Sequence, residues 1–191
     1  MAIRYRENIV WIDLETTGLD PEGNVILEIA VIITDKHLNQ LAQTSLVIHH
    51  PTHALVDLDE WVQTQHQASG LLEEVRRSTL TLAKAEAAAL DLVAAYCPPR
   101  ACPLAGSSVC FDRRFLMRHM PKLDAHLSYR QIDVSSLKEL VKRWYPDKAP
   151  PNGSGAKHRA LPDILESIEE LRYYRKTVFI PPTGPLQLPL G

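Results

Sequence analysis

The sequence predicts one α/β domain on a mixed sheet, in which an antiparallel three-strand meander is joined by parallel strands and flanked by helices. Three observations support this prediction. The first third of the chain contains three apolar strand patterns joined by short links, which favour antiparallel pairing. The middle of the chain changes to a helical period. The second half alternates strand and helix patterns, which is typical of parallel crossovers.

The three N-terminal strands are expected at about Ile9 to Leu14, Val25 to Thr34 and Leu41 to His50. Each segment is bounded by residues that favour turns. Helices are expected between Asp57 and Tyr96, including an alanine-rich stretch from Ala83 to Ala95 that has high helix propensity. These helices are expected to cover the sheet.

The second half gives five further elements. The expected strands are Leu104 to Val109 and Tyr129 to Val134, and the expected helices are Asp112 to His119, Ser136 to Trp144 and Pro162 to Arg175. Each strand pattern is followed by a helix pattern. This order predicts that the later strands run parallel within the same sheet.

Two proline-rich segments help to predict how the chain is divided into a domain and a tail. Pro146 to Gly155 is short for a linker between domains, so we expect a surface loop that presents Lys157, His158 and Arg159 to a site. Pro181 to Gly191 is expected to be a loosely held tail. We therefore predict a single domain over residues 1–180 and a tail over residues 181–191.

Composition excludes several classes of function. A chain of 191 residues with 45% hydrophobic content is large enough for one well-cored domain. Its net charge of −2 argues against tight non-specific binding to long duplex nucleic acid, but a short anionic substrate remains compatible. Three cysteines without CxxC spacing argue against a disulfide framework or a zinc site. Because no apolar run approaches the roughly 20 residues that span a bilayer, the expected compartment is the cytoplasm.

Asp13 and Glu15 are the most informative residues, because they place two carboxylates one residue apart in an apolar strand. Side chains alternate along a strand, so these two point to the same face. Burying both charges is costly unless protons, hydrogen bonds or a metal compensate. A hard divalent cation is the natural partner. The alternative is a solvated strand end that leads into a turn.

Three other residues are ambiguous when each is taken alone. Asp112 precedes an amphipathic helix and could be its N-cap. Asp163 follows a proline at a helix start, where an acid complements the helix dipole. His158 could be an ordinary surface histidine. Their occurrence together with Asp13 and Glu15, each at the end of an element, favours an active site.

This set of residues resembles the DEDDh 3'-to-5' exonucleases of the ribonuclease H-like superfamily, and within them the oligoribonucleases. The three motifs match in order at Trp11 to Leu19, at Asp112 to Leu116, and at His158 to Leu161 with Asp163. Asp57 to Leu71 and Tyr129 to Ser135 are similar to segments particular to oligoribonucleases. The resemblance covers nearly the whole chain and implies a ribonuclease H-like fold.

The resemblance implies a metal-dependent hydrolase that removes 5'-mononucleotides from the 3' end of very short RNA, diribonucleotides above all. It implies that two divalent cations, normally Mg²⁺ or Mn²⁺, are held by Asp13, Glu15, Asp112 and Asp163. Two such ions can activate a water and stabilise both the entering and the leaving oxygen. His158 is implied as the base that takes the proton of that water.

The resemblance also implies a substrate site and a homodimer. Leu19 and Trp61 would pack against the bases, Ser108, Arg130 and Ser135 would hold the 5'-phosphate, and Tyr129 would reach in from the second subunit. A closed phosphate cap of this kind measures substrate length. From the residues alone, Leu19 and Trp61 equally fit core positions. Tyr129 and Arg130 equally fit an ordinary amphipathic strand.

The chain departs from the resemblance beside the second motif. Oligoribonucleases usually carry Asn, Gly and Gln where this chain has Ser107, Cys110 and Phe111, so contacts near Ser108 are expected to differ. Two rival functions remain open. One is another DEDDh enzyme, such as a proofreading or tRNA-trimming exonuclease, and the other is a catalytically silent binding module.

Two acids outside the motifs, Glu28 and Asp133, are expected to be structural. Ser136 and Glu139 have the spacing of a capping box, so Ser136 is expected to cap its helix. That arrangement would leave the Ser135 hydroxyl available for phosphate. The alternative is that Ser135 is itself the cap.

Overall fold

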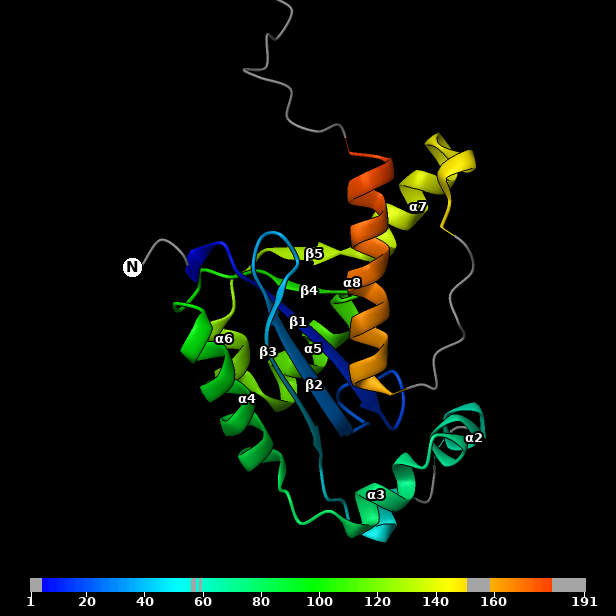
Figure 1. Cartoon of the computed structure of the whole chain (residues 1–191). Helices are drawn as coiled ribbons and strands as arrows, with labels where there is room; N and C mark the ends of the chain where they lie inside the picture. Colours follow the sequence, from blue (N-terminus) through cyan, green and yellow to red (C-terminus); the bar gives the residue numbers. More distant parts are fainter. Residues whose placement is uncertain (1–4, 56–57, 59, 151–158, 180–191) are drawn as a thin grey trace, which may run out of the picture.

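The computed structural model describes residues 5–55, 58, 60–150 and 159–179 (Figure 1). They form one five-stranded sheet in the order β3-β2-β1-β4-β5. The strands are β1 (Ile9–Thr16), β2 (Ile26–Thr34), β3 (Gln40–Val47), β4 (Leu104–Gly106) and β5 (Gln131–Asp133). The first three pair antiparallel, whereas β4 pairs parallel to β1 and β5 parallel to β4. The predicted mixed sheet is confirmed.

The described helices are α2 (Glu60–Ala68), α3 (Leu71–Arg77), α4 (Leu82–Tyr96), α5 (Cys110–His119), α6 (Pro121–His126), α7 (Val134–Trp144) and α8 (Ala160–Thr177), with 3-10 turns at η1 (Thr52–Leu55) and η2 (Pro146–Lys148). Gly70 separates α2 from α3 with a φ of 77°, a left-handed conformation that glycine adopts without strain. The sequence did not predict α6, which begins at Pro121 directly after α5. In the described parts of the chain, no helix is long and apolar enough to span a membrane.

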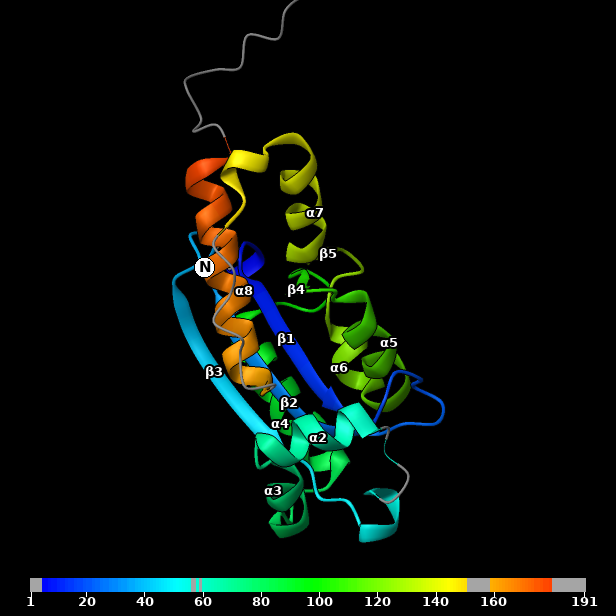
Figure 2. The same cartoon turned by 90° about the vertical axis from the view of Figure 1, so that its right-hand side faces the viewer.

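Helices cover both faces of the sheet (Figures 1 and 2). On one face, Val10, Ile12 and Leu14 of β1 belong to a cluster completed by side chains of α4, α5 and α6. On the opposite face, Trp11 belongs to a cluster completed by α7 and α8. Asp13 shares the face of Trp11 because side chains alternate along β1, so its carboxylate lies on the side of α8.

The short strand β4 opens a gap beside β1. Their parallel pairing covers only Val10 and Trp11 of β1, and β4 ends at Gly106. A Cβ atom at Gly106 would lie 3.1 Å from the carbonyl oxygen of Ile12, so glycine permits this close approach. We predicted a longer strand, to Val109, and this was wrong because Ser108 turns the chain with a φ of 55°. The amide of Leu14 is therefore left for a side-chain partner.

The connection from β3 to α4 passes over the end of the sheet. A small cluster of Leu27, Leu55, Leu71, Leu72 and Val75 holds α3 there. Figure 2 shows α2 and α3 lying near the end of β1 and the start of α8. The N-terminal part of α8 and the end of β1 thus meet beside α2.

Candidate active site

Three carboxylates from two distant parts of the chain converge where β1 ends. Asp13 and Glu15 project from β1, and Asp163 lies in the first turn of α8. Each offers a carboxylate oxygen, and these oxygens all lie within 4.8 Å of one another. All three residues are partly buried. The arrangement can bind a hard cation, because carboxylate oxygens are the ligands that Mg²⁺ and Mn²⁺ prefer.

Asp112 completes the acidic group from the other side of the gap beside β1. Its Oδ1 accepts a hydrogen bond of 3.0 Å from the Leu14 amide, and the residue is only 4% exposed. The N-cap alternative was wrong, because Val109 holds the N-cap position and Asp112 falls in the first turn of α5. This hydrogen bond satisfies the Leu14 amide, which a longer β4 could have paired.

Burial, together with crowding of negative charge, raises the pKa values of these acids. Burial, followed by the charge of Asp112, raises the pKa of Asp13 well above its usual range. Burial and the charge of Asp163 raise the pKa of Glu15 to about 8. Burial also raises the pKa of Asp112 to about 7, against the hydrogen bond from Leu14. A divalent cation would relieve this repulsion, so the donor set fits such an ion.

We expect the metal-free chain to lose stability as pH rises. The unfolded carboxylates of Glu15 and Asp112 titrate at ordinary values of 4.5 and 3.8, but the folded ones hold their protons to about 8 and about 7. The free energy of unfolding is therefore highest below the ordinary pKa values. It falls as pH rises from there through the pKa values of the folded chain. Melting temperatures in EDTA should decline over this range, and saturating Mg²⁺ should flatten the decline. A metal-free melting temperature independent of pH would contradict the clustering.

His66 is a neighbour of the acidic group that the sequence analysis missed. It is a buried residue of α2, with Nδ1 3.8 Å from Glu15 Oε2 and Nε2 2.9 Å from the Thr16 carbonyl oxygen. The carbonyl can only accept, so Nε2 carries the hydrogen. His66 thereby ties α2 to the end of β1. No sequence pattern links it to Glu15, because the contact depends on where α2 lies.

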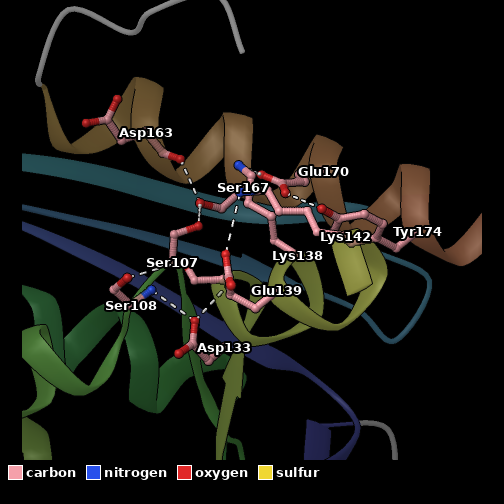
Figure 3. Close-up of polar contacts among 11 residues, drawn as sticks. Ser107, Ser108, Asp133, Lys138, Glu139, Lys142, Asp163, Ser167, Glu170 and Tyr174 are labelled. Atoms are coloured by element: carbon pink, nitrogen blue, oxygen red, sulfur yellow. Dashed lines mark hydrogen bonds and ion pairs between the residues drawn. The ribbon is translucent and has the colours of Figure 1, made fainter. Parts of the chain in front are cut away.

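Two of the three predicted phosphate residues, Ser108 and Ser135, meet at the start of α7. The Oγ of Ser108 donates to Ser135 Oγ at 3.2 Å. The Ser108 amide donates to Asp133 Oδ1 at 2.9 Å, and Figure 3 shows these two residues together. Both serine caps that we considered for this helix were wrong. Asp133 is the N-cap, and its carboxylate accepts from the amide of Ser135 and from the hydroxyl of Ser136. Asp133 is thus structural, as expected. Its Oδ1 accepts from the amides of both Ser108 and Ser135, and so holds these two residues together.

The two residues before β5 face solvent. Tyr129 is 80% exposed, and the Arg130 guanidinium lies 5.3 Å from the centre of its ring. The amphipathic-strand alternative was wrong, because β5 begins only at Gln131. Leu19 is 77% exposed, which excludes the core alternative for it. These side chains are available to a ligand or to another subunit.

Two predicted residues fall outside this description. His158 lies outside the described residues. Trp61 lies in α2, but its side chain is not among the described ones. The roles of both residues therefore stay predictions.

The structure describes the three residues that depart from the family pattern, Ser107, Cys110 and Phe111. The hydroxyls of Ser107 and Ser167 lie 2.8 Å apart, and Ser167 donates to the carbonyl oxygen of Asp163 at 3.0 Å (Figure 3). Phe111 packs against Phe115, with their ring centres 5.0 Å apart, and Cys110 is exposed. Ser107 therefore links the end of β4 to the helix that carries Asp163.

Comparison with known proteins agrees with this geometry. The family model described as Exonuclease matches residues 10–171. Oligoribonuclease of Pseudomonas aeruginosa is 50% identical over 170 residues, covering 88% of this chain and 94% of that protein. Oligoribonuclease of Nitrosomonas eutropha is 49% identical over 173 residues, covering 90% and 96%.

Solved structures support the fold. Exonuclease I of Methylocaldum szegediense matches with a TM-score of 0.68 at 18% identity, covering 90% of this chain. The zinc-bound complex of E. coli exonuclease I with single-stranded DNA matches with a TM-score of 0.66 at 14% identity. This chain spans about two fifths (41%) of each of those longer chains. The sheet is therefore of the ribonuclease H-like kind, and the chain belongs to the oligoribonuclease family of exonucleases.

Proposed function

We propose that this chain is a 3'-to-5' exoribonuclease that degrades very short oligoribonucleotides, diribonucleotides above all, to 5'-mononucleotides. The observation that carries the proposal is the convergence of Asp13, Glu15 and Asp163, with Asp112 beside them, at the end of β1. Burying several acids together is costly unless protons or a cation compensate. Half of the aligned residues are shared with a curated oligoribonuclease.

These four acids would hold two divalent cations, which we propose to be Mg²⁺ or Mn²⁺. When bound, such ions lower the pKa of a water and stabilise charge on the entering and leaving oxygens of the phosphate. His158 is proposed to take the proton of that water, because imidazole titrates near neutral pH. The protein arranges the carboxylates beforehand, through β1, α5 and α8, so little reorganisation is needed when the ions bind.

Length selection is proposed to come from the serine pair and Arg130. The hydroxyls of Ser108 and Ser135 lie together at the start of α7, where the Ser135 hydroxyl, which accepts from Ser108, can donate its own hydrogen to a 5'-phosphate. Arg130 adds a charge-assisted contact. Leu19 and Trp61 are proposed to pack against the bases. A phosphate held at this end leaves room for a dinucleotide and excludes a longer chain that would have to pass through the cap.

We propose a homodimer in which Tyr129 of one subunit completes the phosphate site of the other. An apolar hollow of about 380 Å³ lies between α7 and α8, and Trp144, Tyr145 and Phe179 on its border are exposed. Exposed apolar patches of this kind mark association surfaces. A second copy is the occupant that the Tyr129 role requires.

Trp144→Glu is expected to convert the dimer to monomers, because it places a charge on the proposed apolar contact. Sedimentation measures the mass, and hydrolysis of a diribonucleotide should fall in parallel. Arg143→Glu is the control, because Arg143 is exposed and lies next to Trp144 outside the hollow. A wild-type chain that is monomeric at working concentration and fully active would contradict the proposal.

We also propose the cytoplasm as the compartment. Cys97, Cys102 and Cys110 are all free thiols. Cytosolic reductants keep thiols in this state, whereas secreted proteins of this size usually use paired cysteines as disulfides. A readout is fractionation of cells that express the chain.

The decisive test compares three substrates: a 5'-phosphorylated diribonucleotide, a longer RNA and a matched DNA oligomer, each with and without Mn²⁺. We expect strong preference for the diribonucleotide and no cleavage without metal. Equal cleavage of the longer RNA or of DNA would favour another DEDDh enzyme. No cleavage of any substrate would support the silent binding module.

A further inference from the structure

Arg159 joins three elements at the residue that precedes α8. Its Nε and Nη2 donate to the two carboxylate oxygens of Glu28 in β2, at 2.9 and 3.2 Å. Its Nη1 and Nη2 donate to the two oxygens of Glu74 in α3, at 2.9 and 2.8 Å. The Arg159 side chain is 21% exposed. One planar guanidinium thus grips two carboxylates, which a lysine cannot do.

Glu28 is an unusual partner, because it is only 1% exposed and lies directly opposite Glu15 in the pairing of β1 with β2. Residues opposite each other in an antiparallel pair share one face, and like charges there repel. Glu28 also accepts from the Ser45 hydroxyl at 2.6 Å and from the Ala160 amide at 3.4 Å. The carboxylate of Glu28 is thereby fixed toward the start of α8, and its charge is balanced by Arg159.

The same residue determines where α8 begins. The carbonyl oxygen of Arg159 accepts from the Asp163 amide at 3.2 Å, which closes the first helical turn. The carbonyl oxygen of Asp163 accepts from the Ser167 hydroxyl, which in turn meets Ser107 (Figure 3). The backbone of Asp163 is therefore held from both sides. The Arg159 side chain crosses to β2, the neighbour of the strand that carries Asp13, whereas Ser107 follows β4.

We propose that Arg159 is a positioning residue for the metal site. Its ion pairs with Glu28 and Glu74 fix the first turn of α8 so that Asp163 meets Asp13 and Glu15 on one cation. This inference rests on the proposed function, because Asp163 is a proposed ligand there. Residues that orient metal ligands in this way commonly change metal affinity or activity about 10- to 100-fold when replaced.

The test compares the full chain with Arg159→Gln, Arg159→Lys and Glu74→Gln. Arg77→Gln is the matched control, because Arg77 makes an exposed ion pair with Glu73 on α3, at 2.8 Å. Electron paramagnetic resonance of free Mn²⁺ measures metal binding without catalysis. Diribonucleotide kinetics give kcat and KM, and thermal melting reports folding.

We expect Arg159→Gln to weaken Mn²⁺ binding at least about 10-fold and to lower kcat at limiting Mn²⁺, with KM for the dinucleotide little changed. Excess Mn²⁺ should restore much of kcat. Arg159→Lys should lie between this variant and the wild type, because the charge stays but the double grip is lost. Glu74→Gln should weaken Mn²⁺ binding in the same direction, and Arg77→Gln should match the wild type.

Wild-type Mn²⁺ affinity in folded Arg159→Gln would overturn the inference, and so would a raised KM with unchanged metal affinity, which would indicate a role in holding α3 only. If Arg159→Gln does not fold, Arg159→Lys and Glu74→Gln decide in the same way. An Asp163→Ala chain that binds Mn²⁺ and cleaves normally would instead contradict the proposed site itself. The two failures are therefore distinguishable.

Discussion

Asp13→Ala is expected to abolish hydrolysis of a diribonucleotide while the chain stays folded. Burial raises the pKa of Asp13 most, and the charges of Asp112, Glu15 and Asp163 raise it further. Removing Asp13 takes away one of the carboxylates that would hold the proposed cations. It also removes one charge from a repulsive cluster, so the metal-free variant should melt at a higher temperature than the wild type at pH 8 or above.

Hydrolysis by single-turnover assay and melting in EDTA are the two measurements. The control is Asp91→Ala, because Asp91 is an exposed acid on α4, on the opposite side of the sheet. It should leave both readouts unchanged. An Asp13→Ala chain with wild-type activity would end the two-metal mechanism. An inactive variant that is unfolded would be resolved with Asp13→Asn, which keeps the shape of the side chain.

His158→Ala is expected to lower kcat about 10²- to 10⁴-fold, the usual contribution of a positioned general base. The metal ligands stay in place, so Mn²⁺ affinity and KM should change little. At high pH, hydroxide can replace the missing base. The deficit of the variant should therefore shrink as pH rises above neutrality.

The measurement is a pH profile of kcat for the wild type and the variant at saturating Mn²⁺. His49→Ala serves as the control, because His49 is exposed at the end of β3 and bonds only through its backbone amide in the described contacts. Full activity of His158→Ala at neutral pH would assign proton transfer to another group. A constant deficit at every pH would point to a structural role.

The sheet could be predicted because its signals are local. The apolar runs of β1 and β2 and the short link between them are sufficient to predict an antiparallel pair, and Asp13 and Glu15 stand out against that run. The shared face of these two acids follows from strand geometry alone. The helix α6 could not be predicted in the same way. It has only six residues, Pro121–His126, which is too short for an apolar period to be detected.

Most parts of the site that escaped prediction depend on contacts between distant segments. Asp112 bonds to Leu14 because β4 stops early, and the length of β4 depends on the left-handed turn at Ser108. Asp133, not a serine, caps α7. Its carboxylate accepts from the Ser135 amide in the helix and also from the Ser108 amide beyond β4. His66 meets Glu15 only once α2 lies across the end of the sheet. Propensity and periodicity carry no information about such contacts.

The order of the acids along the chain has a consequence for biosynthesis. Asp13 leaves the ribosome early, Asp112 about halfway through, and Asp163 is synthesised 150 residues after Asp13. Because α8 supplies the last carboxylate and covers one face of the sheet, the group cannot be complete on a partly synthesised chain. A nascent chain with only the first two thirds of the sequence would lack Asp163, one of the proposed metal ligands. We therefore expect metal binding only after α8 has been synthesised and packed on the sheet.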